Sequence, residues 1–177
     1  MIEPTAAPVP SPAASGAFEK RRRQMLNPFL MRLYYLGKLP LAFVAGLRLR
    51  ELDTAHAVVT VPYGWRTTNP FRSTYFAALA MAAELSTGAL AKLATDLAPR
   101  PVAMLIVGLT ASFEKKAAAT TTFTCAEGDK VAAAVARTVE TGEPATAEVE
   151  TIGRSPDGTV VARFTFTWSF KARSRKS

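Results

Sequence analysis

The sequence predicts an α+β fold in which an antiparallel sheet is wrapped around one long central helix. Residues 73–94 form an alanine-rich, almost wholly apolar segment, and this composition predicts a helix that is buried on nearly every side. Alternating apolar and polar residues predict two strands before this helix and about four strands after it. Because a helix that is apolar all round needs cover on every side, a sheet curled around it is the most economical arrangement.

The length and composition of the chain favour a single domain. It has 177 residues, 49% of them hydrophobic, which is enough for one sizeable core and too little for two. We expect one domain over residues 18–177, with short helices in 18–40, a core in 41–171 and a basic tail in 172–177. The proline-rich residues 1–17 lack the basic start and apolar centre of a secretion signal, so we expect a disordered leader there.

Charge and cysteine content restrict the function classes. The 22 Lys and Arg residues against 14 Asp and Glu give a net charge of +8, which favours anionic partners such as phosphate-bearing cofactors, nucleic acid or an acidic membrane surface. The single cysteine, Cys125, excludes an internal disulfide and a cysteine-based zinc site, so we expect a small buried thiol, no metal and a reducing, cytoplasmic compartment. The single histidine, His56, is expected to be packed or partly exposed on a strand rather than catalytic.

The segment 18–40 carries a basic cluster, residues 20–23, followed by apolar residues at helical spacing. This pattern predicts one or two short amphipathic helices, and Pro28 marks the first turn of the second. We interpret them as helices packed over the domain with a solvated basic end. A role at a membrane surface or on nucleic acid stays open as the alternative.

Six segments carry strand patterns. They are residues 41–52, 55–63, 102–117, 118–126, 144–153 and 159–170. The apolar run 102–117 suits a central strand, and residues 127–142 fit either the start of a strand or a short helix. In the last strand Phe164, Phe166 and Trp168 alternate with polar residues, so one face must pack on a large apolar surface. These aromatic residues are expected in the core, which argues against a stacking platform for nucleic acid.

A single carboxylate, Glu84, interrupts the long apolar helix. A charge near the centre of residues 73–91 argues against a transmembrane segment, so we expect none. Inside a protein, a buried carboxylate loses hydration energy unless a partner compensates for it. Glu84 therefore either ties neighbouring loops together through backbone N–H groups, or acts as an acid or base whose pKa burial raises.

The order of elements over residues 41–171 resembles the hotdog fold, in which an antiparallel sheet wraps a central helix, as in acyl-CoA thioesterases. The segment NPFRSTYFAALAMAAELSTG, residues 69–88, is most similar to a branch related to the phenylacetic-acid-degradation thioesterases. Those proteins carry an Asn, a His-Gly-Gly at the start of the helix, and an Asp or Glu further in. Asn69 and Glu84 stand where the Asn and the acid fall, whereas Tyr-Phe-Ala at residues 75–77 replaces the His-Gly-Gly.

The resemblance implies an acyl-CoA thioesterase that forms a homodimer or homotetramer with its sites at the subunit interface. It implies no cofactor beyond the coenzyme A of the substrate. Glu84 would be the general base or nucleophile, and Asn69 would hold a water molecule or the thioester carbonyl. The backbone N–H of Tyr75 or Phe76, at the helix N-terminus, would donate to the oxyanion that forms on this carbonyl. The carboxylate of one subunit would face the helix end of the other.

Further residues are candidates for substrate binding. Ser73 and Thr74 can contact the substrate or cap the helix, and capping is the favoured interpretation. The hydroxyl of Thr87, one helical turn from Glu84, could bond its carboxylate. Each candidate for the phosphates of coenzyme A could equally be an ordinary solvated charge. These candidates are Arg66, Arg72, Lys115 and Lys116.

Two alternatives share the fold. A non-catalytic acyl-binding or oligomerising module is favoured by the missing His-Gly-Gly and by the bulk of Tyr75 and Phe76, since glycines would let a substrate approach the backbone closely. A hydroxyacyl dehydratase resembles chains with a histidine in the loop before the helix, and no histidine stands there. The choice between coenzyme A and an acyl carrier protein as the carrier stays open.

Overall fold

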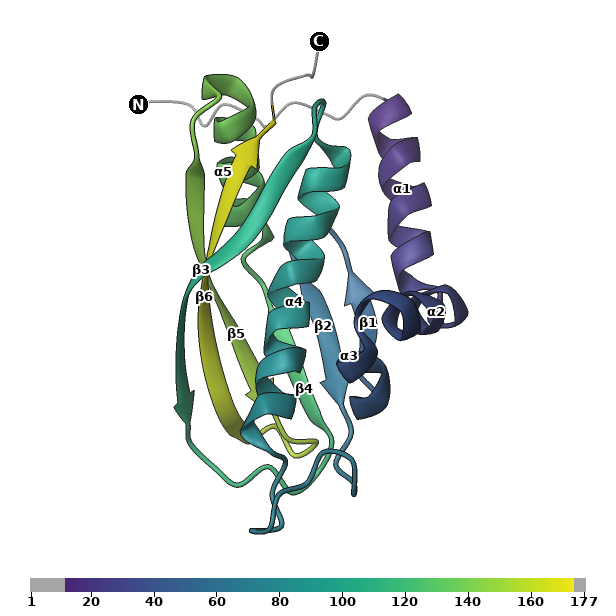
Figure 1. Cartoon of the computed structure of the whole chain (residues 1–177), viewed down its shortest axis with the longest axis vertical. Coiled ribbons are helices and arrows are strands. Elements are labelled where there is room, and N and C mark those ends of the chain that lie inside the picture. Colours follow the sequence, from purple (N-terminus) through teal and green to yellow (C-terminus); the bar gives the residue numbers. More distant parts are fainter. Residues whose placement is uncertain (1–11, 174–177) are drawn as a thin grey trace, which may run out of the picture.

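The fold is a six-stranded antiparallel sheet wrapped around one long helix, so the α+β prediction is confirmed (Figure 1). The structure is a computed structural model that describes residues 12–173. Its elements in chain order are α1 (Pro12–Leu26), α2 (Pro28–Lys38), α3 (Pro40–Ala45), β1 (Arg48–Leu52), β2 (Ala57–Val61), α4 (Phe76–Leu97), β3 (Val102–Phe113), β4 (Thr121–Cys125), α5 (Gly128–Thr141), β5 (Ala145–Arg154) and β6 (Val160–Ala172).

Helix α4 is the centre of the core. It contacts β2, β4, β5 and β6, and its small alanine side chains let the helix approach these strands closely. Ten of its residues are buried. Within residues 12–173, α4 is the single helix that is long and apolar enough to cross a membrane. More than half of its apolar window is buried against the rest of the domain, which is typical of a core helix.

The strand order is β1-β2-β4-β5-β6-β3, and every neighbouring pair is antiparallel. In β6 the predicted alternation is confirmed, because Phe164, Phe166 and Trp168 are buried. The central position predicted for residues 102–117 is wrong, because β3 pairs with β6 alone and forms an edge of the described sheet. An apolar run does not reveal strand order, since order depends on pairings between segments distant in sequence.

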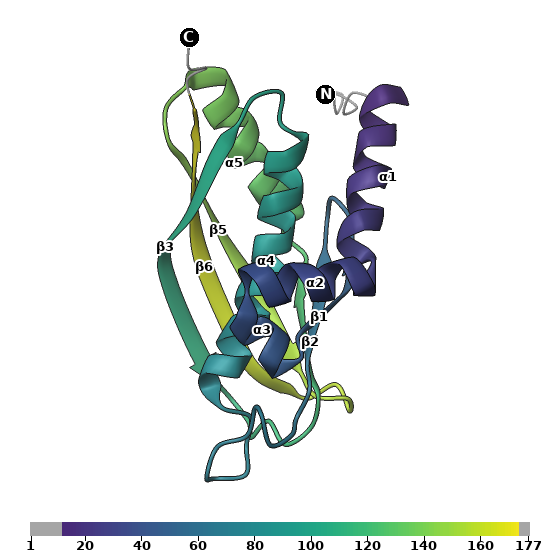
Figure 2. The same ribbon diagram turned by 45° about the vertical axis from the view of Figure 1, so that its right-hand side comes forward.

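Three helices precede the sheet. Two of them, α1 and α2, account for the one or two helices predicted for residues 18–40, and α3 is an additional helix. Asn27 caps α2, because its Oδ1 accepts hydrogen bonds from the N–H groups of Phe29 and Leu30, both at 3.0 Å. Pro28 follows in the first turn, where its missing N–H costs nothing. Helix α1 runs along α4, whereas α2 lies crosswise to it (Figure 2).

The strand predicted over residues 41–52 is wrong in its first half. Pro40–Ala45 forms helix α3, and pairing with β2 begins only at Arg48. Pro40 begins this helix, and Gly46 ends it with a φ of 75°, in the left-handed region that favours glycine. These two signals bound a helix of six residues, which is too short to show a helical period of its own.

The terminal predictions have different outcomes. The disordered leader predicted for residues 1–17 is wrong for residues 12–17, which lie in α1, and its first eleven residues lie outside the described part of the chain. The predicted basic tail begins at Ala172, the last residue of β6, and residues 174–177 also lie outside the described part.

Helix α5 settles the choice left open for residues 127–142. It begins against the turn between β1 and β2, where the N–H of Gly128 donates to the carbonyl of Ala55 at 2.9 Å. A Cβ at Gly128 would overlap the carbonyl of Thr54, so this close approach requires glycine. The helix then packs against β5, β6 and α4.

Candidate active site

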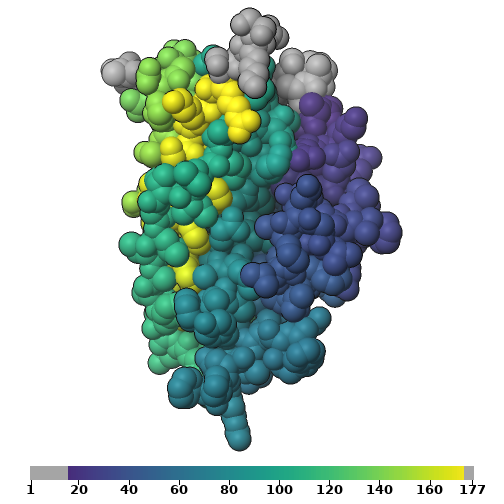
Figure 3. Space-filling view, in the orientation of Figure 1, coloured from purple at the N-terminus to yellow at the C-terminus, as the bar shows by residue number. Residues whose placement is uncertain are grey.

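Glu84 lies on a face of α4 that the sheet leaves uncovered. It lines a groove of about 440 Å³ between α4 and the N-terminal helices. On the side shown in Figure 3, the N-terminal helices lie on one side of α4 and β3 lies on the other. The apolar wall of the groove is made by Met25, Leu30, Met31, Tyr34, Leu39, Leu49, Leu85, Ala89 and Met104. A groove with this lining suits a hydrocarbon or aromatic group.

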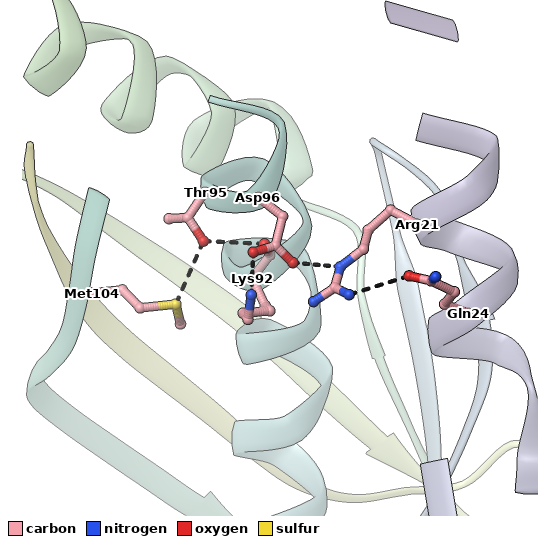
Figure 4. A network of polar contacts seen from close by, with 6 residues as sticks. All are labelled: Arg21, Gln24, Lys92, Thr95, Asp96 and Met104. Carbon is pink, nitrogen blue, oxygen red and sulfur yellow. Dashed lines mark hydrogen bonds and ion pairs between the residues drawn. The ribbon is translucent and has the colours of Figure 1, made fainter. Parts of the chain in front are cut away.

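Ion pairs occupy the polar end of this groove and do not involve Glu84 (Figure 4). Arg21 Nε lies 2.5 Å from Asp96 Oδ2, and Lys92 pairs with the other oxygen of the same carboxylate. The Arg21 guanidinium also donates to Gln24 Oε1 at 3.4 Å. Asp96 is therefore the ion-pair partner of both cations that line the groove, and neither cation pairs with Glu84 in the described chain.

The Glu84 carboxylate has neither an ion pair nor a hydrogen bond within residues 12–173. Burial raises its pKa above the ordinary value of a glutamate, because the charged form loses hydration there. Gly88, one turn further along α4, leaves space for it, since a Cβ at Gly88 would lie 3.0 Å from Glu84 Oε1. A carboxylate with a raised pKa and unoccupied lone pairs can accept a proton near neutral pH.

The hydroxyl of Thr87 does not bond this carboxylate, so that prediction is wrong. Thr87 is fully buried, and its Oγ1 donates to the backbone carbonyl of Glu84 at 3.0 Å. The same oxygen accepts a hydrogen bond from Trp168 Nε1 at 3.1 Å. Thr87 therefore ties β6 to α4 behind Glu84 and leaves the carboxylate facing the groove.

Tyr35 on α2 is a neighbour of this site that the sequence pattern did not single out. Its side chain is buried, and its hydroxyl has no hydrogen-bond partner within the described residues. Burial raises the pKa of Tyr35, and the charges of Tyr34 and Glu84 raise it further. No local signal separates Tyr35 from the exposed Tyr34 beside it, because only the docking of α2 buries one of the two.

Five of the other residues predicted for the site gather at the N-terminus of α4. They line a pocket of about 470 Å³ together with Phe113 and Lys115. The predicted members of this pocket are Asn69, Ser73, Thr74, Tyr75 and Phe76. Asn69 Oδ1 accepts hydrogen bonds from the N–H groups of Phe71 at 3.0 Å and Ser73 at 3.1 Å, so this oxygen organises the loop. Its amide nitrogen is the part that can still reach a substrate.

Ser73 and Thr74 do not cap α4, contrary to the prediction. Thr74 Oγ1 donates to the carbonyl of Ala117 at 3.0 Å, and Ser73 Oγ donates to the same oxygen at 3.4 Å. The N-cap residue is Tyr75, and no side chain bonds the first turn. The two hydroxyls therefore hold the loop before α4 against the segment after β3.

The acid and the proposed oxyanion donors do not meet within one copy of the chain. The N–H of Tyr75 donates to the carbonyl of Thr67 at 2.6 Å, so it is not available to a substrate. The N–H of Phe76 has no partner among the described residues and stays the candidate donor. Phe76 and Glu84 lie roughly 12 Å apart along the helix axis at 1.5 Å per residue. Their meeting across a subunit interface stays a prediction.

The cations predicted for phosphate binding are dispersed. Lys115 lines the pocket at the N-terminus of α4, and Arg72 and Lys116 are exposed on loops. Arg66 lines a third cavity, which adjoins the Glu84 groove and holds three further arginines.

His56 and Cys125 lie where they were expected. His56 is partly exposed, with Nδ1 2.8 Å from Asp53 Oδ2 and Nε2 3.4 Å from Glu51 Oε2. Cys125 is fully buried, and burial raises the pKa of its thiol to about 11, which makes it a poor nucleophile. Over residues 12–173, no three His, Cys, Asp or Glu side chains lie together in a way that could hold a metal ion.

Comparison with known proteins agrees with this fold. The family model described as "Domain of unknown function (DUF4442)" matches residues 30–170. A Shewanella oneidensis protein proposed to be a thioesterase superposes with a TM-score of 0.70 at 12% identity, over 85% of this chain and 99% of that one. A Pseudomonas aeruginosa protein of unknown function, described as a probable thioesterase, gives 0.62 at 20% identity, over 94% and 98%. A thioesterase of Haemophilus influenzae gives 0.59 at 12% identity, over 79% and 88%. No curated protein matches the sequence.

At these identities the structural likeness shows the fold and not the reaction. The family match runs from α2 to β6 and so covers most of the domain. The chain is therefore a member of the DUF4442 family with the hotdog fold of the thioesterase-like proteins.

Proposed function

We propose that the protein hydrolyses acyl thioesters, with acyl-CoA as the substrate and Glu84 as the reacting carboxylate. One observation carries this proposal: the Glu84 carboxylate faces an apolar groove with no cation and no hydrogen-bond donor bound to it in the described chain. A carboxylate kept for structure would tie down backbone N–H groups or an ion pair, since burial without them is costly.

In the proposed reaction Glu84 acts as a general base. It accepts a proton from a water molecule while the water oxygen forms a bond to the thioester carbonyl carbon. The negative charge that develops on the carbonyl oxygen is stabilised by backbone N–H groups at the N-terminus of α4, among which Phe76 is the candidate. The carbon–sulfur bond then breaks, and the thiolate takes the proton that Glu84 releases. In the alternative route the Glu84 carboxylate itself attacks the thioester carbonyl carbon, the thiolate leaves, and water then hydrolyses the resulting anhydride.

A second copy of the chain completes the proposed site. Strand β3 supports this part of the proposal, because it is a twelve-residue edge strand with exposed apolar side chains. Leu105, Val107 and Leu109 are 66%, 56% and 51% exposed. Long apolar edge strands are templates for pairing with another chain. A homodimer or homotetramer would cover this edge and could bring the α4 N-terminus of one copy to the Glu84 groove of the other.

The experiment that tests the proposal is release of free thiol from short, long and aromatic acyl-CoAs. Glu84→Gln keeps the size of the side chain but cannot accept a proton, so hydrolysis should fall at least 100-fold, in the range that general bases contribute. Glu143→Gln is the matched control, because Glu143 is an exposed acid in the turn after α5. Equal activity in wild type and Glu84→Gln would refute the role of Glu84.

A non-catalytic acyl-binding module is the second candidate. The rings of Tyr75 and Phe76 favour it, because they pack edge to face with centroids 4.9 Å apart at the N-terminus of α4, where the thioesterases that this segment resembles carry His-Gly. Binding of acyl-CoA without any release of thiol would support the binding module and leave Glu84 without a catalytic role. A cytoplasmic location stays a prediction.

A further inference from the structure

A third cavity, of about 600 Å³, lies between α2, α3, β1 and β2. It shares the side chains of Met31 and Leu49 with the Glu84 groove, so the two adjoin. Tyr35 also lines this cavity, and its hydroxyl has no hydrogen-bond partner within the described residues. Four arginines line this cavity and no Asp or Glu does. We call it the arginine cavity, after Arg32, Arg48, Arg50 and Arg66.

Contacts with uncharged groups position three of these guanidinium groups. Arg32 lies over the ring of Phe43, 4.8 Å from its centroid. Arg50 Nε donates to Thr60 Oγ1 at 3.2 Å. Arg66 Nη2 lies beside Gly46, where an added Cβ would come within 3.5 Å of it.

None of the four arginines forms an ion pair anywhere in residues 12–173. The closest acid in sequence, Glu51, is directed to His56 instead, at 3.4 Å. Elsewhere in the described chain other arginines do find carboxylates: Arg21 pairs with Asp96 and Arg163 with Glu114. The arginine cavity therefore carries a local excess of positive charge. The N–H groups of each planar guanidinium can donate two parallel hydrogen bonds to phosphate oxygens.

We propose that the arginine cavity binds the phosphate groups of coenzyme A while the acyl thioester lies in the adjoining Glu84 groove. This inference rests on the proposed thioesterase function and makes it more specific. The nucleotide end of coenzyme A carries several negative charges, whereas the phosphopantetheine arm of a carrier protein carries one phosphodiester. Four unpaired guanidinium groups in a concave site match the more highly charged ligand.

A direct binding experiment uses adenosine 3′,5′-bisphosphate, which carries the phosphates of this nucleotide without the thioester. Calorimetry should show binding to wild type and a loss of about tenfold or more in affinity for Arg48→Gln/Arg50→Gln, because each arginine supplies charge-assisted bonds. Arg137→Gln/Lys171→Gln is the matched control, since it removes two exposed cations on α5 and β6. The wild-type affinity should also fall steeply with added salt.

An activity experiment separates this inference from the proposed function. An acyl-CoA is compared with the same acyl group on N-acetylcysteamine, which keeps the thioester and lacks phosphate. The arginine variant should show a raised KM for acyl-CoA with an unchanged kcat, and unchanged hydrolysis of the N-acetylcysteamine thioester. Charge-retaining Arg48→Lys/Arg50→Lys should recover part of the affinity for the bisphosphate.

Each result decides between the two proposals. If both thioesters are hydrolysed and the arginine variant binds the bisphosphate like wild type, the arginine cavity is not the phosphate site, and the proposed hydrolase function is still supported. If neither thioester is hydrolysed but the variant loses bisphosphate binding, the arginine cavity is supported as a phosphate site and the proposed hydrolase function is refuted. Binding to anionic phospholipid vesicles that the bisphosphate does not compete with, or a preference for an acyl carrier protein substrate that the arginine variant retains, would also overturn the inference.

Discussion

Gly88 is the position where a single methyl group should separate stability from activity. It lies inside α4, and an added Cβ would be 3.4 Å and 3.5 Å from two carbons of the Trp168 ring, which is ordinary van der Waals contact. The same Cβ would lie 3.0 Å from Glu84 Oε1, so the carboxylate must move by a few tenths of an ångström. The carboxylate is the flexible end of its side chain, and it can move without shifting the backbone.

The free energy expected for Gly88→Ala follows from these contacts. Replacing glycine by alanine in a helix interior is worth about 0.8–1 kcal/mol in helix propensity. No fixed atom opposes the new methyl group, so most of this gain should remain. In a domain of this size, 1 kcal/mol corresponds to roughly 2–4 °C in Tm. We therefore expect a small rise in Tm, together with reduced thioester hydrolysis because Glu84 leaves its position.

Gly37→Ala is the matched control for this experiment. Gly37 also lies in a helix, α2, and an added Cβ there would meet no atom within 4 Å. It should raise Tm to a similar or smaller extent without changing hydrolysis. The assays are thermal unfolding followed by circular dichroism and release of free thiol from acyl-CoA. A fall of several degrees in Tm for Gly88→Ala, or unchanged hydrolysis, would refute this account of the contact between Gly88 and Glu84.

Three further predictions test the acid, the edge strand and the docking of α5. Because burial raises the pKa of Glu84 in the folded state, its ionisation destabilises the fold as pH rises from the unfolded value of 4.5 through the folded pKa. Glu84→Gln should therefore unfold at higher denaturant than wild type at neutral pH, and a difference that persists unchanged below pH 4.5 would contradict this. Leu105→Lys/Val107→Lys on β3 should give a smaller species in light scattering, whereas Ala133→Lys, at an exposed position of α5, should not. Gly128→Ala should destabilise the domain by about 1–3 kcal/mol in urea unfolding, because the new Cβ overlaps the Thr54 carbonyl; a loss under about 0.5 kcal/mol would show that the turn can move aside.

Local patterns explain the parts of the fold that were predicted correctly. The period of two in β6 is visible because one face of the strand meets the core along its whole length. Helix α3 was missed because six residues are too few to show a period, although Pro40 and Gly46 carried the signals for its two ends.

The candidate site was predicted in part. Glu84 stands out in the sequence because it is a carboxylate in an apolar helix, and the structure places it on the groove without an ion pair in the described chain. Its catalytic role stays a prediction. The roles of its neighbours were less visible. Thr87 accepts a hydrogen bond from Trp168 and Ser73 donates one to Ala117, and in both cases tertiary packing brings the partner near. The N–H of Tyr75 donates to Thr67 within the loop before α4. Hydrogen bonds between segments distant in sequence leave no local pattern.

The sequence by itself determined the long helix, most of the strands and the position of the one acid in the apolar stretch of that helix, since these depend on periodicity and on neighbours along the chain. Only the tertiary structure decided that β3 lies at an edge, that Arg21 pairs with Asp96, and that Tyr35 is buried. The same holds for the arginine cavity, whose four side chains come from α2, β1 and the loop after β2. Strand order, burial and the gathering of charge are set by packing between distant segments, and that packing is a property of the whole fold.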